Sequence, residues 1–213
     1  MKAKGFTLVE IAIVLVIIGL LLGGILKGQE MITQAKIKNV IADFSGVSAA
    51  YHGYQDRYRA IPGDDPNANT RWTTPTVAKQ GNGNGVVAGK YNSSTADEES
   101  RTWWDHLRRA GFVSGSGQGQ PFNALTGQLG VQTGDAAATP GPAMGGISGL
   151  MMCSANLPDK VAIAVDTQMD DGANNAGGVR GKLQNTPNPD IDNSPGSGYE
   201  ETGTNVYVLC RAL

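Results

Sequence analysis

The chain begins with the stretch KAKGFTLVE at residues 2–10, which leads directly into an apolar run from Ile11 to Leu26. The segment from Phe6 to Leu26 has 21 residues, which as a helix would extend about 31 Å and cross the hydrocarbon core of a bilayer. Glu10 is the only charged residue in it. Since an ionised side chain inside a membrane helix costs at least about 3 kcal/mol, Glu10 calls for a charged partner or a position near the membrane surface.

Two ordinary interpretations of this N-terminus leave something unexplained. A secretory signal peptide would fit the basic start at Lys2 and Lys4 and the apolar run behind it. However, the sequence KGQEM (residues 27–31) follows the run, without the pair of small residues that marks a cleavage site. A plain membrane anchor, with the two lysines holding the N-terminus in the cytoplasm, explains everything except Glu10.

A third interpretation accounts for the carboxylate. The hexapeptide GFTLVE at residues 5–10, between a short basic leader and an apolar helix, resembles the class III leader junction of type IV pilins and type II secretion pseudopilins. This resemblance implies cleavage by prepilin peptidase between Gly5 and Phe6, N-methylation of Phe6, and pairing of Glu10 with the Phe6 amine of a neighbouring subunit. An amine and a carboxylate are each costly alone in lipid and neutralise each other as a pair. A contact within one helix is the alternative for this pair.

The resemblance also implies an architecture, a location and partners. The expected fold is α+β and pilin-like: a long N-terminal helix, transmembrane and then amphipathic, packs on a C-terminal antiparallel sheet, with a second short helix in the long loop between them. The chain would cross the inner membrane once, with its N-terminus in the cytoplasm and its head in the periplasm, and then join a cell-surface filament. Its partners would be identical or related subunits, prepilin peptidase, the inner-membrane assembly machinery and, before assembly, membrane lipid.

Composition limits what else the chain can be. With 213 residues, 40% apolar and 17% charged, there is room for the membrane helix and one globular domain. Loss of Lys2 and Lys4 with the leader would leave 15 basic and 19 acidic residues, a formal net charge of −4. Nucleic-acid binding needs clustered Lys or Arg, and the pair Arg108-Arg109 is too short to provide such a site.

The helix is expected to continue well beyond the membrane segment. Apolar residues keep the i, i+3, i+4, i+7 spacing of an amphipathic helix at Ile37, Val40, Ile41, Phe44, Val47, Ser48 and Tyr51. The first strong stop is Pro62-Gly63, so the helix should end near Tyr58. The predicted divisions are a leader at 1–5, a transmembrane part at 6–26, an amphipathic half at 27–58 and a globular head at 59–213.

Within the head, local patterns predict a loop, a helix and three strands. Residues 63–96 are rich in Gly, Asn and Pro and are expected to form a long loop, with a very short strand at Val86-Val87. A capping box at Thr95-Ala96-Asp97-Glu98 starts a second helix, which Gly111 ends. Antiparallel strands are expected at residues 147–153, 160–167 and 204–210, and the loop at 186–203 is expected to be displayed at the surface.

The chain has two cysteines, Cys153 and Cys210. If the head is exported through an N-in membrane helix, the pair lies in an oxidising compartment, where a disulfide is expected. The alternative is two buried free thiols. Pilins resemble this arrangement too, since they carry a disulfide-bounded C-terminal region, here 153–210.

Candidate sites for chemistry are few. Neither His52 nor His106 has a base, nucleophile or metal-ligand partner at a recognisable spacing, which predicts that the protein is not an enzyme. Some pseudopilins bind calcium in loops, and Asp166, Asp170 and Asp171 would suit that ion, but their spacing is not that of an EF-hand and solvated turn carboxylates are the favoured interpretation. No cofactor is therefore expected.

The preferred function is that of a structural subunit of a type IV pilus or pilus-like filament. A type II secretion pseudopilin is the nearest alternative, since it would use the same N-terminus. A membrane-anchored periplasmic enzyme or binding domain is the alternative of a different class. It predicts that the bond between Gly5 and Phe6 stays uncut and that substitution of Glu10 is tolerated.

Overall fold

The computed structural model describes residues 7–137, 141–192, 195–196 and 198–213. By its internal contacts the chain divides into two compact units, Met1–Lys36 and Ile37–Leu213, and each is described by itself. The division lies inside the longest helix. The boundaries predicted at 26/27 and 58/59 stay predictions, and Gly5 and Phe6 lie outside the described residues.

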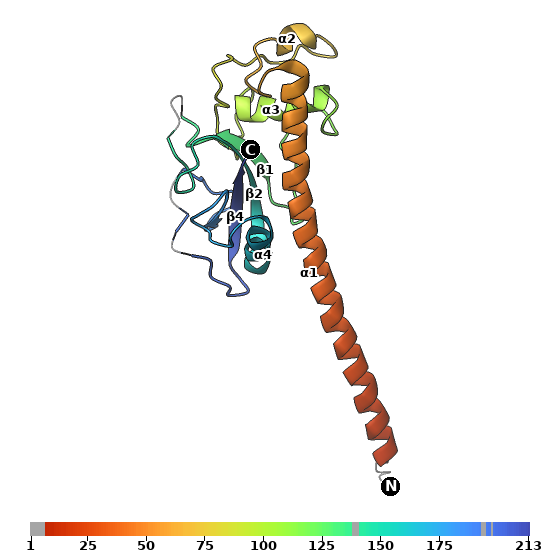
Figure 1. Ribbon diagram of the computed structural model, residues 1–213. Helices are drawn as coiled ribbons and strands as arrows, with labels where there is room; N and C mark the ends of the chain where they lie inside the picture. Colours follow the sequence, from red (N-terminus) through yellow and green to blue (C-terminus); the bar gives the residue numbers. More distant parts are fainter. Residues whose placement is uncertain (1–6, 138–140, 193–194, 197) are drawn as a thin grey trace. The chain divides into compact units, whose positions relative to one another are not determined.

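Helix α1, Leu8–Tyr58, has 51 residues and confirms the predicted long N-terminal helix (Figure 1). In the first unit, every side chain from Thr7 to Lys27 is exposed. Among the described residues, α1 is the one helix long and apolar enough to cross a membrane. So large an exposed apolar surface requires lipid or other protein chains to cover it.

The second unit contains the end of α1 and all remaining elements. Its four strands form one antiparallel sheet in the order β1-β2-β4-β3, and Figure 1 shows β1, β2 and β4 as neighbouring arrows. The predicted α+β class is therefore confirmed. The elements after α1 are α2 (Ala68–Arg71), α3 (Glu99–Arg109), β1 (Leu129–Thr133), β2 (Leu150–Pro158), α4 (Asp159–Met169), β3 (Val179–Leu183) and β4 (Val206–Ala212).

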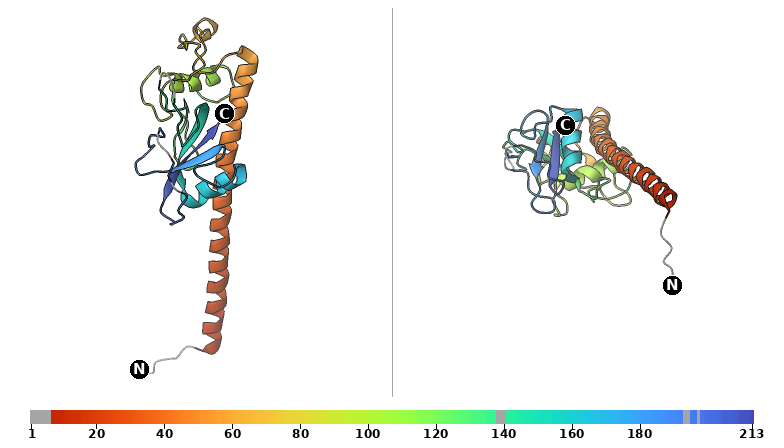
Figure 2. Two further views of the ribbon diagram at one scale, coloured as in Figure 1. Left: turned by 60° about the vertical axis from the view of Figure 1, so that its left-hand side comes forward. Right: turned by 90° about the horizontal axis from the view of Figure 1, so that it is seen from below.

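Side chains alternate between the two faces of the sheet along each strand. Both faces are covered, each by a buried cluster. Met152 of β2 belongs to a buried cluster shared with α3, α4 and the second half of α1; α4 lies beside the strands in both views of Figure 2. Its neighbours Met151 and Cys153 belong to a second cluster, which loop residues such as Tyr91 and Ile191 complete. The buried residues of α1 repeat at helical spacing, as predicted, and are Ile37, Val40, Phe44, Val47, Ala50, Tyr51 and Tyr54.

One predicted strand is wrong, since residues 160–167 form most of helix α4. The sequence VAIAV (residues 161–165) alternates branched residues with alanine, which suggested a strand. In the structure, Val161, Ala162 and Val165 are buried, whereas Lys160 and Thr167 are exposed, a burial pattern of helical period. Alanine is the strongest helix former. The buried face of α4 packs in the same cluster as the residues of the sheet.

The predictions around the second helix are partly wrong. Helix α3 exists, but the expected capping box does not, because Glu98 is the N-cap and makes no side-chain capping hydrogen bond. Asp97 before it has a positive φ of 66°. Val86 and Val87 form no strand, and the short helix α2 lies in the segment predicted as loop. The loop at 186–203 is not simply displayed, since Ile191 is fully buried.

The Gly-Asn run at residues 81–85 closes around a buried carboxylate. One oxygen of Asp64 accepts hydrogen bonds from the Gly83 N–H at 2.6 Å and the Asn84 N–H at 3.2 Å, and the other accepts from the Gly85 N–H at 2.7 Å. A Cβ atom on Gly81 would lie 2.2 Å from the Asp64 Cα, so only glycine fits there. This segment is therefore a cage for Asp64, which is 3% exposed.

Candidate functional site

The first turn of α1 holds Glu10 in a defined position. The N–H and the hydroxyl of Thr7 each donate to Oε2 of Glu10 at 2.8 Å, and the Glu10 N–H donates back to the Thr7 hydroxyl oxygen at 3.3 Å. This reciprocal pattern is a capping box. The Thr-x-x-Glu spacing that signals such a box is present at residues 7–10, but sequence reasoning applied it only to residues 95–98.

The capping box leaves half of the Glu10 carboxylate available. Oε1 makes no hydrogen bond to any residue that the structure describes, and the side chain is exposed. Glu10 is also the only charged residue between Thr7 and Leu26. The site is therefore a single acceptor for a cationic group, oriented by its own helix and surrounded by exposed apolar side chains.

The two cysteines form the predicted disulfide, and no described cysteine is free, so the alternative of two free thiols is wrong. Cys153 and Cys210 are direct partners across β2 and β4, with their Cα atoms 4.0 Å apart. Both are fully buried in the second cluster. The bond therefore links the two central strands of the sheet.

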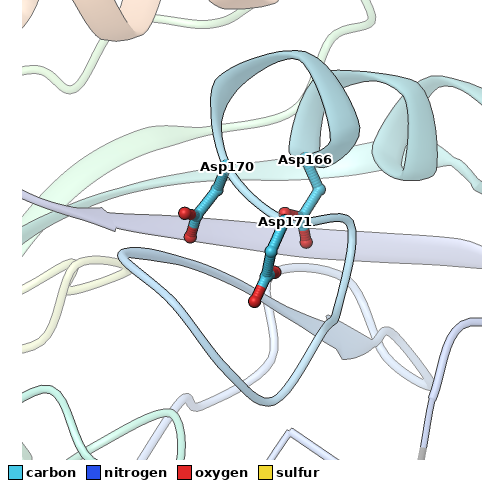
Figure 3. A group of neighbouring side chains, drawn as sticks. All are labelled: Asp166, Asp170 and Asp171. Atoms are coloured by element: carbon cyan, nitrogen blue, oxygen red, sulfur yellow. The ribbon is translucent and has the colours of Figure 1, made fainter.

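The structure brings together the three predicted calcium candidates at the end of α4 (Figure 3). Each of Asp166, Asp170 and Asp171 offers an oxygen within 4.8 Å of the others. Asp166 is buried and accepts hydrogen bonds from the Tyr199 hydroxyl at 2.5 Å and the Gly172 N–H at 3.2 Å. Burial, with a smaller contribution from the two neighbouring carboxylates, raises the pKa of Asp166.

The other two carboxylates also bind backbone groups. Oδ2 of Asp170 accepts from the N–H groups of Gly178 at 2.5 Å and Val179 at 2.9 Å. Oδ1 of Asp171 accepts from the Ala173 N–H at 2.8 Å. All three aspartates therefore hold the chain that leads from α4 to β3.

His52 is exposed, whereas His106 is fully buried. Nδ1 of His106 accepts from the Gly63 N–H at 2.9 Å, and Nε2 lies 2.7 Å from the Lys79 carbonyl oxygen, to which it donates in the neutral ring. Burial lowers the pKa of His106. The ring is thus a neutral bridge between two loop segments, and the structure does not bring the two histidines together with a nucleophile.

The carboxylate of Asp65, a second buried group near His106, was not identified from the sequence. Asp65 is fully buried and accepts hydrogen bonds from the Tyr54 hydroxyl at 2.6 Å, the Asn67 N–H at 2.9 Å and the Arg71 guanidinium. Burial alone would raise the pKa of Asp65, but these donors outweigh it and the pKa is lowered. Of these partners of Asp65, only Asn67 is local, two residues away, whereas Arg71 and Tyr54 lie 6 and 11 residues away in sequence. The local pattern DDPN at residues 64–67 therefore gives no sign of them.

These features define a class: a protein with an exposed apolar helix that carries one oriented carboxylate, and an α+β head of pilin-like layout closed by a disulfide. Residues 1–26 match the family model described as the prokaryotic N-terminal methylation motif. This motif is the class III prepilin leader of type IV pilins and pseudopilins, so the predicted resemblance is confirmed. No curated protein and no solved structure matched the chain significantly.

Proposed function

We propose that the chain is a structural subunit of a type IV pilus or pilus-like filament, assembled through α1. The observation that supports this most directly is the combination, in one segment, of the methylation motif at residues 1–26 and an exposed apolar run at residues 7–26 with a single carboxylate. A helix of this kind is covered by lipid before assembly and by other subunits after it. The role is structural rather than enzymatic.

The N-terminus would mature in two steps. Prepilin peptidase cuts between Gly5 and Phe6, which creates a new amine on Phe6, and this amine then receives a methyl group. Glu10 of one subunit pairs with the Phe6 amine of its neighbour, and the open Oε1 of the carboxylate is the acceptor. Each charge alone is costly in an apolar environment, so the pair both neutralises the two groups and fixes the axial position of one subunit against the next.

The proposed route runs through the inner membrane. The chain crosses it once, with the N-terminus in the cytoplasm and the disulfide-bonded head in the periplasm, where oxidation is favoured. The inner-membrane assembly machinery then transfers the processed subunit to a filament at the cell surface. Identical or related subunits are its partners there, and no cofactor takes part.

The experiment that tests the proposal compares two carboxylates of the same helix. Glu10→Gln should leave the amount of chain in the membrane fraction unchanged and reduce its incorporation into sheared filaments by about tenfold or more, because the amine loses its partner. Glu30→Gln is the matched control: Glu30 pairs with Lys27 outside the apolar run at exposed positions, and its loss should leave filament yield normal. Normal yield with Glu10→Gln would refute the assembly role.

Intact mass of the mature chain tests the processing steps. Loss of residues 1–5 together with the gain of one methyl group is expected, and an uncut chain would support a membrane-anchored periplasmic domain instead. Deletion of the gene separates the two filament roles. Loss of surface filaments would support the pilus, and a secretion defect with surface filaments intact would support the pseudopilus.

A further inference from the structure

A hollow of about 480 Å³ lies in the second unit, beside the C-terminal end of α3. Its walls are the segment from Trp72 to Thr76, the last turn of α3 and the loop at Gly115–Gly117. A second hollow of about 330 Å³ adjoins it and shares Thr76, Asp105, Arg109 and Gly117. Pockets that bind small molecules usually measure about 300–1,000 Å³, so the first hollow alone could hold one sugar ring.

Two neighbouring arginines, Arg108 and Arg109, line the hollow. They differ in their partners, since only Arg109 forms an ion pair among the described residues. Arg109 donates from Nε to the buried carboxylate of Asp105 at 2.7 Å and from Nη1 to the Thr76 carbonyl at 2.8 Å. Its charge is therefore neutralised within the protein. Arg109 forms the wall of the hollow but offers little to a ligand.

Arg108 forms no ion pair among the described residues, although the Asp105 carboxylate is near enough to act on its charge. It donates to the carbonyl oxygens of Gly117 at 2.6 Å and Ser114 at 3.3 Å, and in the described part of the chain no carboxylate lies within ion-pairing distance of it. Burial lowers the pKa of Arg108, but a guanidinium stays charged at neutral pH. The N–H groups of Arg108 that these two carbonyls do not use are available to an anion in the hollow.

The remaining wall is suited to a ring rather than to a bare ion. Trp72 is half-buried and lines the hollow, and Pro75 lines it as well. Thr74 and Ser116 add hydroxyl groups, both at exposed positions. Aromatic surfaces bind the apolar faces of ring compounds, and hydroxyls fix their orientation by hydrogen bonds.

We propose that this hollow binds an acidic saccharide, a sugar ring that carries a carboxylate. The carboxylate takes the free donor of the Arg108 fork, the ring lies against Trp72, and the ring hydroxyls meet Thr74 and Ser116. This site is independent of the filament role of α1, since all of its residues belong to the second unit.

Calorimetric titration of the full chain in detergent micelles tests the proposal, with sodium glucuronate, glucose and inorganic phosphate as three separate probes. Glucuronate should bind saturably. Glucose, which lacks the carboxylate, and phosphate, which lacks the sugar ring, should each bind at least about tenfold more weakly. Equal binding of phosphate would overturn the saccharide assignment, and no binding of glucuronate would overturn the site.

Two variants and a matched control locate the binding. Arg108→Gln should weaken glucuronate binding by about tenfold or more. Because Arg108 also holds the loop at 114–117, Thr74→Asp provides a second test: it adds a repelling charge at an exposed position without touching Arg108. Thr73→Asp places the same charge on the adjacent exposed residue, which does not line the hollow, and should bind like the unchanged chain. Equal affinity for all three variants would overturn the proposal.

Discussion

Asp65 is a carboxylate in a core position whose charge is stabilised by three donors. Replacing it by Asn would leave the Arg71 guanidinium, 26% exposed, without its acceptor. Breaking a buried pair in this way costs several kcal/mol, and partial exposure of the arginine reduces the effect. For Asp65→Asn we expect a loss of about 2–4 kcal/mol in the free energy of unfolding at pH 7, measured by denaturant titration. A loss below 0.5 kcal/mol, about the limit for an ordinary surface substitution, would contradict the role assigned to Asp65.

The lowered pKa of Asp65 also predicts an acid-sensitive fold. A depressed carboxyl pKa contributes stability above the unfolded value, near 3.9, and this contribution disappears as the pH falls through the folded value. The melting temperature of the unchanged chain should therefore drop below about pH 4. The same acid step should be smaller in Asp65→Asn, and an equally steep fall in both proteins would speak against the prediction.

His106 predicts a separate transition at milder pH. Its folded pKa is lowered by burial, so the unfolded chain binds a proton more readily, and stability falls once the pH drops below the unfolded value near 6.5. Protonation would place an N–H on Nδ1 opposite the donating Gly63 N–H. We expect a decrease in melting temperature between about pH 7 and pH 5 that is absent in His106→Gln. Persistence of the decrease in that variant would assign it to other groups.

At the scale of the element, α1 has two halves with different energetic roles. Phe44 is fully buried, whereas Leu15 is 65% exposed. Phe44→Ala should cost about 3–5 kcal/mol of head stability. Leu15→Ala should leave the unfolding of the head unchanged, since the Leu15 side chain is exposed. Thermal unfolding of both variants in detergent micelles makes the comparison. Equal effects would show that the exposed half also supports the head.

Helix α4 and the chain after it are held by three aspartates that bind backbone N–H groups and Tyr199. Calcium needs six to eight oxygen ligands, and both oxygens of Asp166 are already engaged. We therefore expect millimolar calcium to leave the melting temperature unchanged. A saturable rise with calcium, absent in Asp170→Asn, would instead identify a metal site.

The sequence predicted those elements whose signal is local. The period of α1, the apolar runs of β2 and β4, and the cysteine pair are all visible without the structure. Strands β1 and β3 read LGVQT and VRGKL, where glycine and charged residues hide the pattern, and their burial comes from the segments that cover them. The cage around Asp64 was equally hidden, because its donors lie 19 to 21 residues further along. The Thr7 cap was the one local signal that went unused.

At the scale of the whole molecule, the disulfide joins residues 57 positions apart. Closing a loop of this length restricts the unfolded chain and stabilises the fold by about 4 kcal/mol in the chain-entropy model. The double variant Cys153→Ser/Cys210→Ser should lose a comparable amount, measured by denaturant unfolding without reductant. Because the bond is fully buried, dithiothreitol should reach it in the unchanged chain only after unfolding. Rapid reduction of the folded protein would contradict this.

The cage around Asp64 has a consequence for chemical ageing. Asn-Gly bonds deteriorate when the glycine nitrogen attacks the asparagine side chain and releases ammonia, which leaves a succinimide. In the pairs Asn82-Gly83 and Asn84-Gly85, both attacking nitrogens point their hydrogens at the Asp64 carboxylate, at 2.6 and 2.7 Å. We expect a nitrogen held in this way to attack its neighbour's amide more slowly, so that Asp64 slows deamidation at both bonds.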